Sequence, residues 1–220
     1  MATKKAKGPR KTPRQERSRV TVEAILEAAA QVFESRGYAA GTTNHIAERA
    51  GVSIGSFYQY FPDKESVANV LIERHMQEGA KLFAEVLGHV GQQPHGLARV
   101  LDHFVGAMVE MHAKNPRLQH VLLEEVPHSP EMHEALRREK RKAMGAVKTL
   151  LESSPEVHVR DLPAAAYVVV NTVEGLTHEF VASMPCDLSQ RRFKKELVAM
   201  LLGYLVGAPG VRGSEDGATR

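Results

Sequence analysis

The sequence predicts an all-α protein, and two observations carry this prediction. Its eleven prolines leave long intervals free of proline, within which apolar residues recur at the spacing of an α-helix. No alternating pattern of useful length indicates a β-strand. With 220 residues, 43% of them hydrophobic and 25% charged, the chain suffices for one large or two small domains with a buried core.

The predicted helices follow one another between the prolines. The first covers residues 21–37, because Ile25 and Phe33 share one face and Gly37 supplies a C-terminal stop. A long helix follows Pro62 over residues 64–87. Four later segments keep the helical period, at about 95–114, 131–153, 164–184 and 188–207.

Composition excludes several classes of protein. No run of 18 or more apolar residues exists, so no segment is predicted to span a membrane. The basic N-terminus lacks the apolar stretch of a secretory signal. The single cysteine, Cys186, excludes an internal disulfide and fits a reducing compartment. We therefore expect a cytoplasmic protein.

The first 19 residues concentrate positive charge. Eight basic residues and one acidic residue give them a net charge of +7, which leaves −4 of the total of +3 for residues 20–220. A basic segment on a mildly acidic body is typical of an arm that meets a polyanion such as nucleic acid. A disordered, solubilising tail has the same composition, so both interpretations of this segment stay open.

Two short helices are predicted after the first long one. The stretch "TTNHIAERA" begins at Thr42, whose hydroxyl is suited to cap the helix, and Gly51 ends it in a left-handed conformation. Ser53 is the predicted cap of the second short helix, which covers residues 54–60 or 54–61 before Pro62. Two helices joined by a short turn that contains glycine are typical of a helix-turn-helix.

The second short helix has two different faces. At 100° per residue, Phe57 and Phe61 share a face with Ile54, so we expect all three to be buried. The opposite face is small, polar and aromatic and has no acidic residue, which suits a helix in the major groove of DNA. It consists of Gly55, Ser56, Tyr58 and Gln59.

The motif "GYAAGTTNHIAERAGVSIGSFYQYFPDKESV" resembles the DNA-binding domain of the tetracycline-repressor (TetR) family of bacterial transcriptional regulators. The resemblance runs from about Val20 to Val70, and the later helices are similar to the family only in architecture. It implies a homodimer whose paired recognition helices read a palindromic operator, and a small molecule in the C-terminal domain that releases the DNA. The sequence departs from the family pattern at His45, where many members carry an acid, so we expect no capping box.

The resemblance also implies which residues contact DNA. Residues 42–44 would meet the DNA backbone, with Asn44 a candidate for base contact, and Lys64 would meet a phosphate at the start of its helix. The hydroxyls of Tyr58 and Tyr60 can reach phosphates or base edges, or remain in water while the rings pack. The predicted DNA-binding residues are Thr42, Thr43, Asn44, Ser53, Gly55, Ser56, Tyr58, Gln59, Tyr60 and Lys64.

These observations predict four segments and three partners. The partners are a double-stranded DNA operator, a second copy of the chain and an unidentified small molecule; no cofactor, metal or membrane is expected. The segments are a disordered basic arm at residues 1–19, a helix-turn-helix domain at 20–66, a helical ligand-binding and dimerisation domain at 67–207, and a disordered tail at 208–220.

The segment 164–184 carries a polar stripe on an otherwise apolar helix, made of Tyr167, Asn171, Glu174 and His178. Buried polar groups need partners, and three alternatives stay open: a ligand pocket, a polar seam at the dimer interface, and internally satisfied hydrogen bonds. Glu174 and His178 have the i, i+4 spacing of a metal-binding pair. A hydrogen-bonded pair is favoured, because the sequence shows no third ligand.

Two further residue sets are predicted in the C-terminal half. Rings, methionines and one polar group on the middle helices are candidates for lining a ligand pocket, although methionine at helical spacing also fills cores. The last helix has a wide apolar face, which fits either a four-helix dimer interface or an ordinary core helix. The pocket candidates are Phe104, Met108, Met111, His112 and Met144, and the interface candidates are Phe193, Leu197, Met200, Leu201 and Tyr204.

Two rival functions are weaker. An enzyme would need an active site, but the sequence has no HExxH metal motif, glycine-rich phosphate loop or nucleophile motif. An architectural protein that binds any DNA through its basic arm would not need the outward face of the second short helix. The sequence therefore predicts a sequence-specific DNA-binding regulator.

Overall fold

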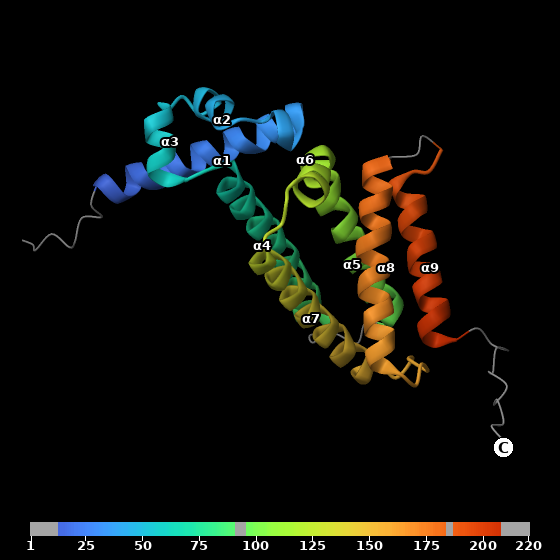
Figure 1. Cartoon of the computed structure of the whole chain (residues 1–220). Coiled ribbons are helices and arrows are strands. Elements are labelled where there is room, and N and C mark those ends of the chain that lie inside the picture. Colours follow the sequence, from blue (N-terminus) through green and yellow to red (C-terminus); the bar gives the residue numbers. More distant parts are fainter. Residues whose placement is uncertain (1–12, 91–95, 184–186, 208–220) are drawn as a thin grey trace, which may run out of the picture. The chain divides into compact units, whose positions relative to one another are not determined.

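The computed structural model describes residues 13–90, 96–183 and 187–207, and these residues form helices and no strand (Figure 1). The predicted all-α class is therefore confirmed. The helices are α1 (Pro13–Ala40), α2 (Thr43–Arg49), α3 (Ile54–Tyr60), α4 (Lys64–Val90), α5 (Leu97–Ala113), α6 (Pro116–His120), the π-helix η1 (Val121–Glu125), α7 (Pro130–Ser153), α8 (Leu162–Ser183) and α9 (Gln190–Val206).

The chain divides into two compact units, and the division falls inside α4. Unit 1 comprises residues up to Arg74 together with 117–127, and unit 2 comprises residues 75–116 and those from His128 onward. Unit 1 includes more of the chain than the helix-turn-helix domain predicted at 20–66. The first turns of α4 and the segment that contains η1 belong to it. None of the described helices has the length and apolar character needed to cross a membrane.

Unit 1 is built on α1, which packs against α2 and η1. Its core consists of side chains from α1, α2, α3 and the start of α4, among them Ile25, Phe33, Ile46, Phe57 and Val67, each with no exposed surface. These residues are the apolar positions of the helical period, so burying them away from water stabilises the unit.

The end of α1 is interrupted at Gly37, as the sequence predicts. Gly37 has φ 74°, a conformation that glycine adopts readily, and the chain continues as a short helical extension to Ala40. The carboxylate of Glu125 in η1 accepts a hydrogen bond from the backbone N–H of Tyr38 at 2.8 Å. A Cβ at position 37 would lie 2.9 Å from an oxygen of the same carboxylate. The positive φ favours glycine here, and a Cβ would also displace the Glu125 carboxylate from its bond to Tyr38 N–H.

The helices α5, α7, α8 and α9 contribute to an apolar core in unit 2. Val105 and Leu205 have no exposed surface, and Val169 and Leu201 are almost as completely buried. Contacts between α7 and α8 and between α5 and α9 hold these helices together. The C-terminal stretch 188–207, predicted to be helical, is indeed covered almost entirely by α9.

Three expectations about helices need correction. Residues 13–19, which were predicted as part of a disordered arm, are helical, because α1 begins at Pro13; residues 1–12 and the predicted tail 208–220 lie outside the described residues. Ile54 was expected in the core but is 38% exposed, since it occupies the first position of α3. The helices α6 and η1 between residues 116 and 125 were not predicted.

Candidate functional site

The α2–turn–α3 segment is held in place by the capping groups that the sequence predicts. The Thr42 hydroxyl accepts a hydrogen bond from His45 N–H at 3.3 Å, and the Ser53 hydroxyl accepts one from Ser56 N–H at 3.1 Å. Gly51 has φ 67° in the turn between the helices. The His45 ring Nδ1 lies 3.2 Å from the carbonyl oxygen of Ala40. This contact is made in place of a capping box.

Two phenylalanines fix the orientation of α3. Phe57 has no exposed surface and Phe61 is 7% exposed, with their ring centroids 6.1 Å apart. Tyr58, by contrast, is 53% exposed and lies edge-on to Phe57. Because two rings hold one side of this short helix in the core, the opposite side faces solvent.

All ten residues predicted to bind DNA are at least partly accessible, and none is buried. Hydroxyl groups link several of them: Thr43 Oγ1 lies 3.2 Å from the Tyr58 hydroxyl, and the Ser53 and Ser56 hydroxyls are 2.9 Å apart. The exposed members are Thr42, Asn44, Ser53, Gly55, Tyr58 and Gln59, and the half-buried ones are Thr43, Ser56, Tyr60 and Lys64.

The contacts of Lys64 differ from the phosphate contact that the resemblance implied. Its ammonium donates hydrogen bonds to the carbonyl oxygens of Tyr38 at 2.6 Å and Ala39 at 3.3 Å, and it lies 4.1 Å from the centre of the Tyr38 ring. At the start of α4, the Asp63 carboxylate already accepts a hydrogen bond from Ser66 N–H at 2.7 Å. In unit 1, Lys64 therefore links α4 to the end of α1.

The polar stripe of α8 does not behave as one unit. Tyr167 is 59% exposed, and the Asn171 amide donates to the Tyr167 carbonyl oxygen within the same helix at 2.7 Å. Glu174 forms an ion pair with Lys140 of α7 at 2.8 Å. The expectation of a hydrogen-bonded pair between Glu174 and His178 is wrong, because the carboxylate is held by Lys140 instead.

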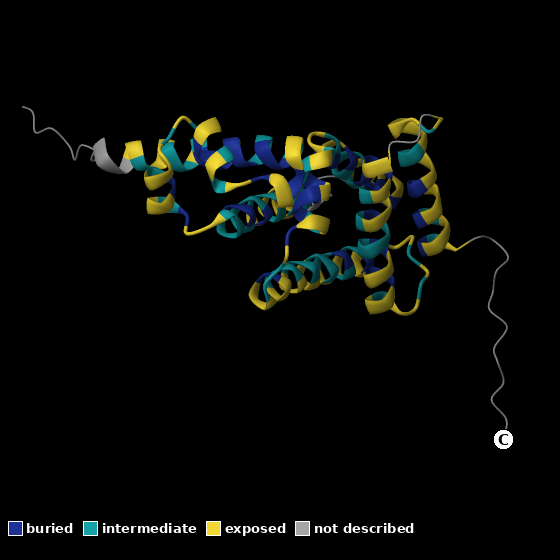
Figure 2. Cartoon of the chain, turned by 45° about the horizontal axis from the view of Figure 1, so that its top comes forward, coloured by how far each residue is buried: buried dark blue, intermediate teal, exposed yellow. Residues whose placement is uncertain are grey.

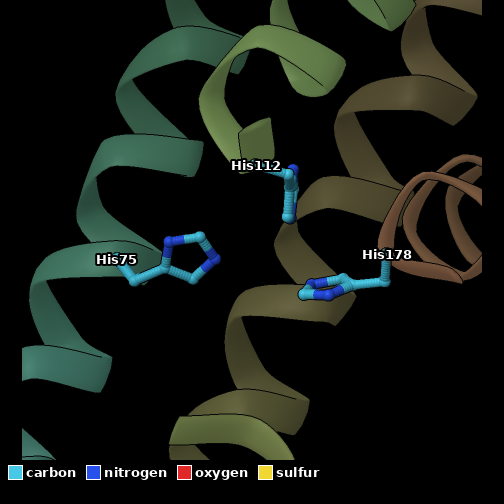
Figure 3. Close-up of side chains that lie close together, drawn as sticks. All are labelled: His75, His112 and His178. Atoms are coloured by element: carbon cyan, nitrogen blue, oxygen red, sulfur yellow. The ribbon is translucent and has the colours of Figure 1, made fainter. Parts of the chain in front are cut away.

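His178 belongs to a cluster that the sequence did not predict. The histidine cluster, defined as His75 of α4, His112 of α5 and His178 of α8, brings three imidazoles together inside unit 2 (Figure 3). The His112 and His178 ring centroids are 4.3 Å apart, and His75 lies 5.3 Å from His112 and 6.5 Å from His178. One potential ligand atom from each ring lies within 4.8 Å of the other two.

Burial keeps these imidazoles neutral. It lowers the pKa of His75 to about 4, with a further contribution from the neighbouring His112. Burial and the two other rings likewise lower the pKa of His178 to about 4, against a weak opposing effect of the Glu174 carboxylate. The pKa of His112 is also lowered by burial, although its hydrogen bond to Met108 and the charge of Glu174 act in the other direction.

The remaining pocket candidates lie in or beside the core of unit 2. Phe104 meets Phe83 edge-on at 5.2 Å and helps to line an apolar cavity with residues of α5, α7, α8 and α9. Met108 and Met144 are half-buried, and Met111 is buried. Of the predicted set, the structure brings His112 and His178 together, whereas Phe104 lines this separate cavity.

The predicted interface face of α9 is divided between core and surface. Phe193 stacks on Phe180 of α8 at 4.2 Å, and Leu197 and Leu201 are buried in the core of their own chain. Of this set, Met200 is 49% exposed and Tyr204 is 40% exposed. In Figure 2 both α8 and α9 carry buried residues on one side and exposed residues on another. The helix α8 exposes three large apolar residues, Tyr167, Val168 and Leu176. The expectation that this helix is buried on all sides is therefore wrong.

Comparisons with known proteins add to this description. The model of bacterial regulatory proteins of the tetR family matches residues 25–71, and the model of the tetracyclin repressor-like C-terminal domain matches residues 96–205.

Curated relatives and solved structures that resemble this chain are also named as regulators. The HTH-type transcriptional repressor BepR of Brucella suis is 38% identical over 101 residues, 45% of this chain and 46% of BepR, so the match spans less than half of that protein. The uncharacterized HTH-type transcriptional regulator YvkB of Bacillus subtilis is 25% identical over 66% of this chain and 77% of its own. The structure of the fatty acid degradation regulator FadR from Bacillus halodurans has a TM-score of 0.66 at 22% identity. That match covers 96% of this chain and 100% of FadR, a likeness in fold.

Proposed function

Because this chain belongs to the TetR family of bacterial transcriptional regulators, we propose that it is a repressor that binds a palindromic DNA operator as a homodimer. A small molecule bound among the helices of unit 2 releases the operator. BepR, with which the chain shares 38% identity over 101 residues, is a repressor by name.

The outward face of α3 is the observation that carries the proposal. Gln59 and Tyr58 are exposed on a helix whose other side is fixed by Phe57 and Phe61. No residue of α3 is charged, so nothing on it repels phosphates as it enters a groove. An amide side chain such as Gln59 can form paired hydrogen bonds with a base edge in the major groove. These properties support a role for α3 as the helix that reads sequence.

The exposed apolar residues of α8 and α9 support dimerisation. Tyr167 and Leu176 on α8, and Met200 and Tyr204 on α9, are each at least 40% exposed in the single chain. The two helices contact each other. A second copy of the pair would cover these residues and complete a four-helix interface related by a twofold axis. Such an interface also sets the spacing of two α3 helices on a palindrome.

Binding measurements on selected and random DNA test the proposal. An operator is first selected from a random duplex library with the full chain, and its affinity is compared with that of a scrambled duplex at the same salt concentration. Gln59→Ala should weaken operator binding by about 1–3 kcal/mol for each base that the glutamine reads, and leave the scrambled duplex unaffected. Gln77→Ala makes the same change at an exposed position of α4 in unit 2 and should change neither affinity.

The selection itself is also informative. A palindrome among the selected duplexes is expected from a dimer with two identical reading helices. Equal losses of affinity for operator and scrambled DNA in Gln59→Ala would assign that residue to backbone contact. Failure to enrich any duplex would overturn sequence-specific binding.

A further inference from the structure

The histidine cluster lies in unit 2, whereas α3 belongs to unit 1. We propose that His75, His112 and His178 bind one divalent transition-metal ion of the zinc class. This inference goes beyond the proposed function, since a repressor that responds to an organic molecule needs no metal. Its failure would leave the DNA-binding proposal untouched.

The positions of the three rings suit a shared ion. They come from three helices and converge on one space, as Figure 3 shows. In a tetrahedral site with Zn–N distances of about 2.0–2.1 Å, two ligand nitrogens lie about 3.4 Å apart. The potential ligand atoms here lie within 4.8 Å of one another. Rotation of the three side chains about their χ angles would shorten these separations.

The hydrogen bond of His112 prepares it to be a ligand. Its Nδ1 lies 2.8 Å from the carbonyl oxygen of Met108, one helical turn earlier. A carbonyl oxygen can only accept, so Nδ1 carries the proton and the lone pair is on Nε2. Metal-binding histidines usually donate their second ring nitrogen to such a carbonyl or to a carboxylate, which orients the ring and makes the ligand more basic.

His75 and His178 lack a comparable partner. Within the described residues, neither ring has a hydrogen bond, although each is partly buried and faces the other two rings. Their depressed pKa values keep both rings neutral near pH 7, and the neutral ring is the form that binds a metal. An ion would satisfy lone pairs on all three rings at once.

The kind of ligand indicates the kind of ion. Imidazole nitrogen suits zinc, copper, nickel and iron, whereas calcium and magnesium prefer oxygen. Glu174, the acidic residue whose charge acts on both His112 and His178, is held in an ion pair with Lys140. Three histidines leave a fourth position of a tetrahedral ion for water or a small anionic ligand.

Titration of the full chain without a histidine tag tests the site. After treatment with a chelator and removal of the chelator, Zn²⁺ is titrated calorimetrically, with Mg²⁺ as the comparison ion. Wild type should bind one Zn²⁺ per chain and bind Mg²⁺ at least 100-fold more weakly. His75→Gln and His178→Gln should each reduce Zn²⁺ affinity by at least about 100-fold, because even the loss of an outer partner of a ligand typically reduces it 10- to 100-fold.

Controls separate loss of the site from loss of the fold. His75 and His178 are only partly buried, so their variants are preferable to a change at His112, which is 2% exposed; circular dichroism verifies that each is folded. His158→Gln removes an exposed imidazole elsewhere in unit 2 and should leave affinity unchanged. Absence of stoichiometric Zn²⁺ binding by wild type, or equal affinity in folded His75→Gln and His178→Gln proteins, would overturn the proposal.

Discussion

The helix-turn-helix and the histidine cluster arrange polar groups in opposite ways. In residues 42–60 the hydroxyl and amide groups lie on the outside of one continuous segment, and buried rings hold the helix from beneath. In unit 2 the three imidazoles come from α4, α5 and α8 and face one another. Exposed polar groups keep their hydration, so they add little to stability and can vary with the DNA sequence to be read. Imidazoles turned inward lose hydration and need a partner.

Substitutions should therefore affect folding and binding differently in the two regions. In the helix-turn-helix, changes to buried residues should affect folding, and changes to exposed residues should affect binding alone. In the histidine cluster the imidazoles proposed to bind the metal ion are themselves partly buried, so one substitution should affect both folding and metal binding.

Phe57→Ala should have the largest effect on stability. The ring is fully buried and contacts Phe61, so its removal leaves a cavity and should lower the free energy of unfolding by about 3–5 kcal/mol. Urea unfolding followed by circular dichroism measures this. DNA binding should be lost together with the structure of unit 1.

Tyr58→Phe is the matched control for that change. It keeps a ring at the neighbouring position and removes only an exposed hydroxyl, which should alter stability by no more than about 0.5 kcal/mol. If Phe57→Ala were as stable as Tyr58→Phe, α3 would not depend on its buried face, and the contrast between inward and outward sides of this helix would fail.

The sequence predicts the helix-turn-helix better than the histidine cluster, because the first is one continuous segment and the second joins three helices. Thr42, Gly51 and Ser53 were predicted in their capping and turn roles because caps and turns depend on neighbours within a few residues. Phe57 and Phe61 were predicted as buried because helical spacing places them on one side. Ile54 has the same spacing but is exposed, since the first residue of a helix can lie beyond the edge of the core.

The histidine cluster depends on tertiary packing and so has no local pattern. The sequence marks His112 as a pocket candidate and His178 as part of the α8 stripe, and no sequence pattern marks His75. The three positions lie on different helices, and no spacing between them indicates that they meet. The failed pairing of Glu174 with His178 has the same origin, because Lys140 reaches Glu174 from α7.

Lys64→Met should have an intermediate effect, and it separates two roles of one residue. The change keeps most of the aliphatic stem but removes the ammonium that donates to the carbonyl oxygens of Tyr38 and Ala39. Hydrogen bonds from charged groups are worth about 1.5–3 kcal/mol, and for a half-buried lysine we expect the lower end, about 1.5 kcal/mol. Affinities for operator and scrambled DNA should fall by similar factors, since neither role reads sequence.

Lys81→Met removes a highly exposed ammonium from the same helix, α4, and should change stability by less than about 0.5 kcal/mol. Urea unfolding and DNA titration of both variants provide the comparison. Unchanged stability in Lys64→Met together with weaker binding to any DNA would favour the phosphate contact implied by sequence resemblance, and the bonds to α1 would then contribute little.

Glu174→Gln should have a smaller effect on stability than Lys64→Met, and it defines the boundary of the histidine cluster. The ion pair with Lys140 is 2.8 Å long, but the Lys140 and Glu174 side chains are 37% and 47% exposed, so its loss should lower stability by about 0–1 kcal/mol. The Glu174 carboxylate is not among the groups whose potential ligand atoms lie within 4.8 Å of one another. Zn²⁺ affinity should therefore change by less than about tenfold, or 1.4 kcal/mol.

Lys140→Gln provides the opposite test, because it leaves the carboxylate of Glu174 in place and removes the ammonium that holds it. If three imidazoles and an open position describe the site, Zn²⁺ affinity in both variants should stay within tenfold of wild type, while His178→Gln lowers it at least 100-fold. A 100-fold loss in Glu174→Gln, with tighter binding in Lys140→Gln, would make Glu174 a fourth ligand. The inward-facing site would then be closed by a carboxylate from α8, with no position left for a water molecule or a small anion.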